Sequence, residues 1–511
     1  MTERDALLAA IRATPDDDTP RLVFADWLDE NEPDPKPKKG MSPSSWAALI
    51  RAECELARLR DDGSAAAALH HFFTEKDDQS LKGVRWDRVD PEVGRRIELR
   101  KLADRARGPS KKARNTGRPK GFVGGHWDEG THRGFPDGMH LGDGERLLAA
   151  LPALTEYCPP VSATAFALTP GPSGRDLAEG GLGRWCRELT IHLGPPENAG
   201  LFRAMVAHPD AAQLRGLTVG LTDDASDANR ALTALADSRH LTGLRALTLT
   251  TSAAVPPELV TRLARSKLMR GLTRLHLSGP VSEAALQMAD VGNCPTLRTL
   301  ALSESNLSDD DAILLAAAPG LAGLRHLDLQ DNRIGGAGAS ALLASPHLAN
   351  LAVLDLDYNQ VRGLDRAALA SAPKGGLRVL AFHGSRLTAN DITALTASPR
   401  LADLMYFDAD DNQLAASAIP RLVRGFGDRP PAVLYIAQSE LNEAAVEALT
   451  NWPAAERIDM LHLIESRMTT SAAKAIACCP HLKGLNHLCA TPVHPAGRTA
   501  LKKRFGPRAL V

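Results

Sequence analysis

The amino-acid sequence predicts an α/β solenoid, a coil of short parallel strands and helices, preceded by a small helical domain. Two observations predict this fold. A leucine pattern returns at a near-constant interval along the later two-thirds of the chain, and each interval holds strand-like alternation followed by helical spacing of apolar residues. The composition is that of a folded protein, because 44% of the 511 residues are hydrophobic and 24% are charged.

The repeat is clearest in LRHLDLQDNRI, from Leu324, and LAVLDLDYNQV, from Leu351, which share the pattern L-x-x-L-x-L-x-x-N. The second leucine of this pattern marks each repeat, at intervals of 25 to 30 residues, and with the degenerate Phe166 it gives 13 repeats. The markers are Leu189, Leu217, Leu247, Leu275, Leu300, Leu327, Leu354, Leu380, Phe407, Leu434, Leu461 and Leu488.

The helix of each repeat has recognisable ends. Ser282, Ser308, Thr388 and Asn442 are expected to cap helix starts, and steps such as Ser345-Pro346 to end helices. The turn after each strand is expected to be held by an asparagine side chain at Asn332, Asn359 and Asn412. Serine takes this place in other repeats and supplies fewer hydrogen bonds, at Ser305, Ser385, Ser439 and Ser466.

This pattern resembles the leucine-rich repeat family, in its helix-bearing variety similar to ribonuclease inhibitor, over residues 161–495. The resemblance implies a horseshoe with a parallel sheet on its concave face and helices on its convex face. Residues 496–511 are then expected to form a C-terminal cap, whose polar outer face would carry Lys502, Lys503 and Arg504.

Residues 1–60 resemble a small bacterial repeat-companion domain, in PRLVFADWLDE from Pro20 and in the helix IRAECELARL from Ile50. That family's activity is unsettled, so the resemblance implies architecture and a bacterial context. From the residues alone, the segment is three short amphipathic helices. Their expected core is Leu7, Leu8, Ile11, Leu22, Phe24, Trp27, Leu28, Leu49 and Leu56.

Residues 61–160 are expected to be an irregular connecting region that includes a cap for the solenoid and a basic loop at 95–120. This loop holds eleven Lys or Arg residues, whereas the whole chain has a formal charge of -1, so any nucleic-acid binding would be local. The candidate phosphate-binding residues are Lys111, Lys112, Arg114 and Arg118. The alternative interpretation is a solvated linker, which the lack of interleaved aromatic residues favours.

The sequence disfavours both secretion and enzyme activity. The first residues form no secretory signal, no apolar run could span a bilayer, and the seven cysteines contain no C-x-x-C pair, which together predict a cytoplasmic protein without a membrane partner. No nucleophile, nucleotide or cofactor motif is recognisable, so we expect no enzyme activity, no catalytic residue and no cofactor. Histidine and cysteine clusters lack metal-ligand spacing, and no metal site is predicted.

The concave face carries the candidate partner site, because strand alternation turns the residues beside each marker leucine away from the core. One group is an acidic and histidine band. Asp328 and Asp355 would lie side by side, and the repulsion between their like charges would cost stability. This cost suggests a role in binding, although a solvated acidic face is the alternative. The other group is an apolar strip in which Tyr406 and Tyr435 are the expected anchors and which a neighbouring loop could instead cover. The candidate residues are Asp328, Gln330, Asp355, Asp357, His383, Tyr406, Asp408, Asp410, Val433, Tyr435 and Met460.

The leading functional hypothesis is a non-enzymatic scaffold that binds a protein partner on the concave face. The first alternative is a nucleic-acid-associated adaptor that uses residues 95–120. A weaker alternative is a GTPase-activating or other regulatory repeat protein, which rests on fold analogy alone.

Overall fold

The computed structural model describes most of the chain, and its residues form two compact units. One unit contains residues 1–62 and 95–287, and the other contains residues 63–94 and 288–511. The described residues leave out 1, 15–16, 32–42, 61–62, 76–83, 108–125, 128–130, 133–134, 137–138, 142–161, 166–186, 194–197, 222, 291, 293, 440, 467, 492 and 511.

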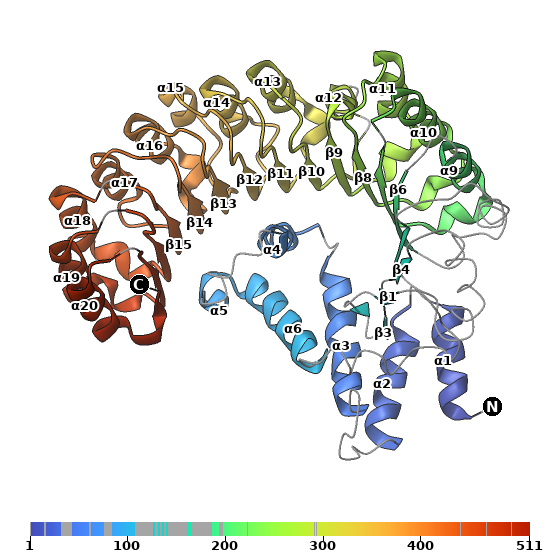
Figure 1. The fold of residues 1–511 in the computed structure, drawn as a ribbon, viewed down its shortest axis with the longest axis horizontal. Coiled ribbons are helices and arrows are strands. Elements are labelled where there is room, and N and C mark those ends of the chain that lie inside the picture. Colours follow the sequence, from blue (N-terminus) through green and yellow to red (C-terminus); the bar gives the residue numbers. More distant parts are fainter. Residues whose placement is uncertain are drawn as a thin grey trace. The chain divides into compact units, whose positions relative to one another are not determined.

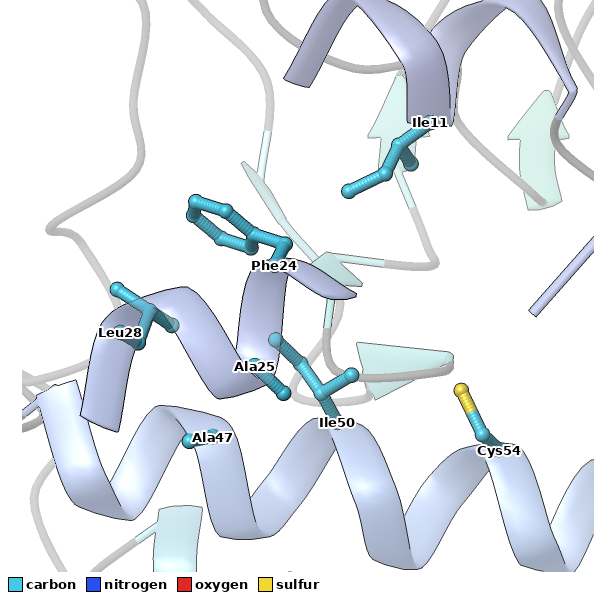
Figure 2. Close-up of a cluster of buried hydrophobic side chains, with 7 residues drawn as sticks. All are labelled: Ile11, Phe24, Ala25, Leu28, Ala47, Ile50 and Cys54. Atoms are coloured by element: carbon cyan, nitrogen blue, oxygen red, sulfur yellow. The ribbon is translucent and has the colours of Figure 1, made fainter. Parts of the chain in front are cut away.

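The first unit begins with three helices, α1 (Glu3–Ala13), α2 (Thr19–Asn31) and α3 (Pro43–Arg60). Their core holds Ile11, Phe24, Leu28 and Ile50 with smaller residues between them (Figure 2). The expected core residues Leu7, Leu8, Leu22 and Trp27 pack around it, whereas Leu49 and Leu56 belong to a second cluster with Leu99 and Ala103. The helical start predicted from the sequence is therefore confirmed.

The region from 61 to 160 is more helical than expected. Its described part contains α4 (Ala65–Glu75), α5 (Trp86–Val89) and α6 (Pro91–Arg107), followed by short strands β1 (His126–Trp127), β2 (Thr131–His132), β3 (Phe135–Pro136) and β4 (Met139–Leu141). The alanine run that opens α4 has high helix propensity, which explains the first of these helices. Arg95 of the basic stretch lies in α6, where its guanidinium bonds both oxygens of Glu55. Lys111, Lys112, Arg114 and Arg118 fall outside the described residues.

The rest of the first unit is repeat structure. Its strands are β5 (Ser162–Ala165), β6 (Glu188–His192), β7 (Gly216–Gly220), β8 (Ala246–Thr250) and β9 (Arg274–Ser278), each parallel to its neighbour. The marker leucines are paired in register from Leu189 through Leu217 and Leu247 to Leu275. Helices α9 (Asn198–Ala207), α10 (Ala225–Asp237) and α11 (Pro257–Ala264) follow the strands in turn, and α12 (Glu283–Asp290) lies at the boundary.

The second unit continues the same pattern. Its strands are β10 (Thr299–Ala301), β11 (His326–Asp328), β12 (Val353–Asp355), β13 (Val379–Ala381), β14 (Tyr406–Asp408), β15 (Val433–Tyr435), β16 (Met460–His462), β17 (His487–Cys489) and β18 (Ala509–Leu510). Its helices are α13 (Asp309–Ala317), α14 (Gly336–Ala344), α15 (Arg366–Ala370), α16 (Ala389–Thr396), α17 (Ala418–Phe426), α18 (Glu443–Thr450), α19 (Thr470–Cys478) and α20 (Pro495–Phe505). The marker residues again pair in register, and those from Leu300 to Leu488 are buried.

In the described part of the chain, thirteen parallel strands from β6 to β18 alternate with helices, which confirms the predicted α/β leucine-rich-repeat solenoid. Within the second unit, Figure 1 shows α13 to α19 along one side of their strands and α4 on the other side. We call the side of β10 to β17 that lies opposite those helices the concave face. No helix among the described residues is long and apolar enough to cross a membrane.

The turns follow the asparagine prediction. Asn332 accepts the amides of Ser305 and Leu307 through Oδ1 and donates through Nδ2 to the carbonyls of Leu302 and Leu329. The residue just before this position adopts left-handed backbone geometry in successive repeats, with φ between 49° and 61°. These residues are Glu304, Asp331, Tyr358, Gly384, Asp411, Gln438 and Glu465. At Ser439 and Ser466, by contrast, the hydroxyl makes one long bond of 3.4 Å to its own turn.

The C-terminal segment contains more than the expected helix. Lys502, Lys503 and Arg504 of α20 are exposed, as a polar outer face requires. The chain then adds β18, in which Leu510 pairs with Cys489 of β17 and covers the strand edge.

Candidate functional site on the concave face

The predicted apolar strip is contiguous on the concave face. The rings of Tyr406 and Tyr435 lie 5.3 Å apart on neighbouring strands, and the Tyr435 hydroxyl contacts Sδ of Met460 at 3.8 Å. Val433 and Met460 are fully buried, and Tyr406 and Tyr435 are only 2% and 4% exposed. A sheet face open to water would leave such side chains accessible, so another part of the unit must cover them.

Helix α4 provides that cover. It contacts β12, and the rings of Phe72 and Phe73 lie 5.5 Å and 5.6 Å from the ring of Tyr406, both near edge-to-face. Phe72 also lies 6.2 Å from the ring of His326 on β11. Aromatic pairs in this geometry stabilise beyond the area they bury. The described residues 63–75 and 84–94 form what we call the docked segment.

The sequence of α4 suits this position. Ala66, Leu69 and Phe72 recur every three residues and are buried, so the helix has one continuous apolar face. Ser64 precedes the helix, and its Oγ accepts the amide of Ala67 at 3.1 Å, which caps the first turn.

Ion pairs hold the second half of the docked segment. The Nε atom of Arg85 donates to Oδ1 of Asp459 at 2.6 Å, and its Nη2 atom donates to the Gly484 carbonyl at 2.8 Å. The backbone amide of Arg85 donates to the other oxygen of Asp459 at 2.9 Å. Further along, Asp90 accepts from Arg378 at 2.9 Å. Between these pairs, Trp86 packs on Phe73 with ring centroids 4.4 Å apart.

The acidic band has a structural explanation. In three repeats the aspartate that ends the strand accepts the amide two residues further on, from Asp328 to Gln330, from Asp355 to Asp357 and from Asp408 to Asp410, at 2.9 to 3.0 Å. Each carboxylate thus satisfies a backbone donor that the turn leaves without a strand partner. These bonds offset the cost of placing like charges side by side.

The second row of aspartates joins neighbouring repeats. Asp357 accepts the amide of His383 at 2.7 Å, and Asp410 accepts the amide of Ala437. The other oxygen of Asp410 lies 2.6 Å from Nδ1 of His462. All four aspartates from Asp355 to Asp410 in the band are buried, while Asp328, Gln330 and His383 are half-buried.

One group of described residues has metal-ligand chemistry. His383, Asp408 and Asp410 offer ligand atoms that lie within 4.8 Å of one another. Both carboxylates already accept hydrogen bonds, because Oδ2 of Asp408 receives the Tyr406 hydroxyl at 3.0 Å and Asp410 binds as described above. Their place in the sheet is therefore explained without an ion.

Sequence reasoning missed the residues that cover the face. Phe72, Phe73, Arg85 and Trp86 lie outside the repeats, so no periodic pattern singled them out. One signal was present. In a chain with only 4% aromatic residues, three of them fall between positions 72 and 86.

The fold and its inner face are those of a leucine-rich-repeat solenoid. A family model described as Leucine Rich repeat matches residues 293–316 and 324–343. No curated protein matches the sequence significantly. The helical region at residues 1–60 is present, and its assignment as a repeat-companion domain stays a prediction.

Several solved structures are similar. Rad7–Elc1 from yeast aligns at 14% identity with a TM-score of 0.39, over 63% of this chain and 84% of that chain. An internalin, InlF, from Listeria monocytogenes aligns at 16% identity with a TM-score of 0.37, over 59% of this chain and 80% of its own. Human 5T4, the trophoblast glycoprotein, aligns at 20% identity with a TM-score of 0.28, over 42% and 76%.

Proposed function

We propose that this protein is a non-enzymatic interaction scaffold whose concave face binds a protein partner, and that the docked segment occupies the same site as an intramolecular ligand. One observation carries the proposal. Tyr406, the expected partner anchor, is 2% exposed because Phe72 and Phe73 pack against it. The face therefore accepts an aromatic-bearing helix.

The chemistry of the docked segment indicates the kind of partner that would compete with it. A helix that places apolar side chains in a groove is a common mode of peptide recognition, with aromatic residues as its anchors. The Arg85 contacts with Asp459 add a basic group at the margin of the site. The matching partner is a helix with adjacent aromatic residues and a basic residue beyond it.

An intramolecular ligand also sets the apparent affinity of the site. A partner that needs the free face binds only the fraction of molecules in which the segment has left it, so its apparent dissociation constant rises as that fraction falls. Because the segment belongs to the same chain, it competes with a partner at an effective concentration that does not depend on the protein concentration. Release of the segment would thus switch the scaffold on.

The test uses the full chain and a fluorescent peptide of residues 63–94. The double variant Phe72→Asp, Phe73→Asp should undock the segment, because each carboxylate would be buried against Tyr406. The dissociation constant of the peptide should be at least about tenfold lower for this opened variant than for wild type, because the intramolecular competitor is gone. Fluorescence anisotropy measures both affinities.

Two controls make the result specific. Leu314→Asp alters an apolar side chain of α13 that is 60% exposed, and it should leave peptide binding at the wild-type level. Adding Tyr406→Ala to the opened variant should abolish most of the increase in peptide affinity. If the opened variant binds the native peptide no better than a scrambled one, the face is not a helix-binding site.

A further inference from the structure

A pocket of about 510 Å³ lies where the docked segment meets the repeats of the second unit. Arg85, Arg88 and Val89 line it from the docked segment. From the repeats it is lined by residues that immediately precede strands β13 to β16, among them Arg378, Arg429 and Arg457. Five arginines therefore line one pocket of a size typical of small-molecule sites.

Two of these arginines are held in ion pairs between the docked segment and the repeats. Arg85 is held by Asp459, whose side chain is 5% exposed, and Arg378 is held by Asp90 at 2.9 Å. The lining carboxylate of Glu456 is also engaged, because Nζ of Lys483 lies 3.1 Å from it. Of the acidic residues in the lining, only Asp403 forms no ion pair among the described residues.

The other three arginines supply the surplus charge. Arg88 forms no ion pair in the described part of the chain, and Arg457 donates only to the carbonyl of Asp428 at 3.0 Å. Arg429 lies 3.7 Å from the exposed carboxylate of Asp428, a separation at which an exposed pair contributes little. Against these three groups the pocket offers the carboxylate of Asp403 and that of Glu456, whose pair with Lys483 is also exposed.

We propose that this pocket binds a phosphate-bearing small molecule, with Arg88, Arg429 and Arg457 as its ligands. The guanidinium fork matches the geometry of phosphate oxygens, and charge-assisted bonds to several such groups are strong. The alternative is that water solvates the three side chains. The clustering of all three around one cavity, from three separate chain segments, favours an anion site.

The position of the site gives it a regulatory consequence. Arg88 belongs to the docked segment, while Arg429 and Arg457 belong to the repeats, so an anion held by all three links the segment to the concave face. A ligand that binds only the docked state stabilises that state by RT ln(1 + [L]/Kd), so the stabilisation grows with the concentration of free ligand. This consequence rests on the proposed function, whereas the binding itself does not.

Titration calorimetry of the full chain with inorganic pyrophosphate tests the site, with inorganic phosphate as a second probe and sodium chloride at matched ionic strength as the blank. We expect saturable pyrophosphate binding. Arg88→Gln and the pair Arg429→Gln, Arg457→Gln should each weaken it about tenfold, as the loss of a charge-assisted bond does. Arg366→Gln, an exposed arginine of α15 outside the pocket, is the matched control and should leave binding unchanged.

Hydrogen exchange of α4 in the same samples separates the two proposals. Pyrophosphate should slow exchange in α4 of the wild type and have no such effect in Arg88→Gln. Binding that is lost in the pocket variants, without slower exchange in α4, supports the site and overturns its control of docking. Equal heats in wild type and both pocket variants, or no heat beyond the chloride blank, overturn the site itself and leave the peptide experiment on the concave face unaffected.

Discussion

The ring of Phe72 lies 5.5 Å from the ring of Tyr406, with the two planes at 74°. This contact joins a helix outside the repeats to the middle of the repeat sheet. It places the residue expected to anchor a partner beneath a side chain of the same protein. The proposed interaction surface and the helix that covers it thus belong to one chain.

The energetic coupling of these two rings can be measured. In a double-mutant cycle, Phe72→Ala and Tyr406→Ala should each favour undocking, and the two effects should fall short of additivity by about 0.5–1.5 kcal/mol, the range for edge-to-face aromatic pairs. Hydrogen exchange of α4 reports the docking free energy. Strict additivity would mean that the rings do not contact each other in solution.

Removing the turn side chain should destabilise the protein more where it is an asparagine than where it is a serine. Asn332→Ala removes a side chain that makes bonds to both the preceding repeat and its own, and leaves buried backbone groups without partners. We expect a loss of about 2–4 kcal/mol. Ser439→Ala removes one bond of 3.4 Å and should cost less than about 1 kcal/mol. Urea denaturation measures both losses. Amide hydrogen exchange locates them, in β10 to β12 for the first variant and in β14 to β16 for the second. Equal losses would contradict the difference assigned to the two side chains.

These asparagines also show what the sequence could predict. A repeat carries its own register, so the strands, their markers and the turn residues such as Asn332 and Asn412 could be located from periodicity alone. The concave position of Tyr406 followed from strand alternation. Its burial did not, because it depends on Phe72 and Phe73, which lie far away in the sequence in a segment without periodicity.

The acidic band shows a second limit. Side-by-side aspartates are visible in the sequence, and they suggest a binding surface when only charge is considered. The bond from Asp357 to the amide of His383 depends on the turn geometry of two neighbouring repeats. Sequence reasoning predicted that the carboxylates share one face of the sheet, but it could not assign their backbone partners.

Arg400 is a buried cation whose removal should stabilise the protein. It is 1% exposed, its Nη2 atom donates to the Leu348 carbonyl, and its Nε and Nη1 atoms have no partner in the described structure. Burial lowers the pKa of its guanidinium to about 10. Folding therefore disfavours the charged form, so the cost of this charge to stability is fully present below about pH 10 and shrinks as the pH rises above that value.

At neutral pH the full cost of this charge is present, so Arg400→Met should raise the free energy of unfolding by about 1–2 kcal/mol. The advantage of the variant over wild type should be constant from pH 6 to 8 and begin to shrink above about pH 10. Arg366→Met, at an exposed position, is the control. A destabilised Arg400→Met would show that the guanidinium has a partner that compensates its burial.

Two cysteines should differ sharply in reactivity. Cys294 is buried, its thiol donates to the Gly320 carbonyl at 3.4 Å, and burial raises its pKa to about 11. Cys478 is exposed at the end of α19. At pH 8 iodoacetamide should label Cys478 within minutes and leave Cys294 unlabelled until the protein is denatured, because the thiolate is the reactive form. Mass spectrometry of the digested protein measures both. Equal labelling of the native protein would place Cys294 at the surface.

The most direct measurement of the central claim is a photo-crosslink from position 72. A benzophenone analogue of phenylalanine at this position, in a mixture of isotopically light and heavy chains, should crosslink to the peptides that contain His326 or Tyr406, within the same chain. Crosslinks confined to residues 1–62, or formed only between light and heavy chains, would show that α4 does not occupy the concave face of its own repeats.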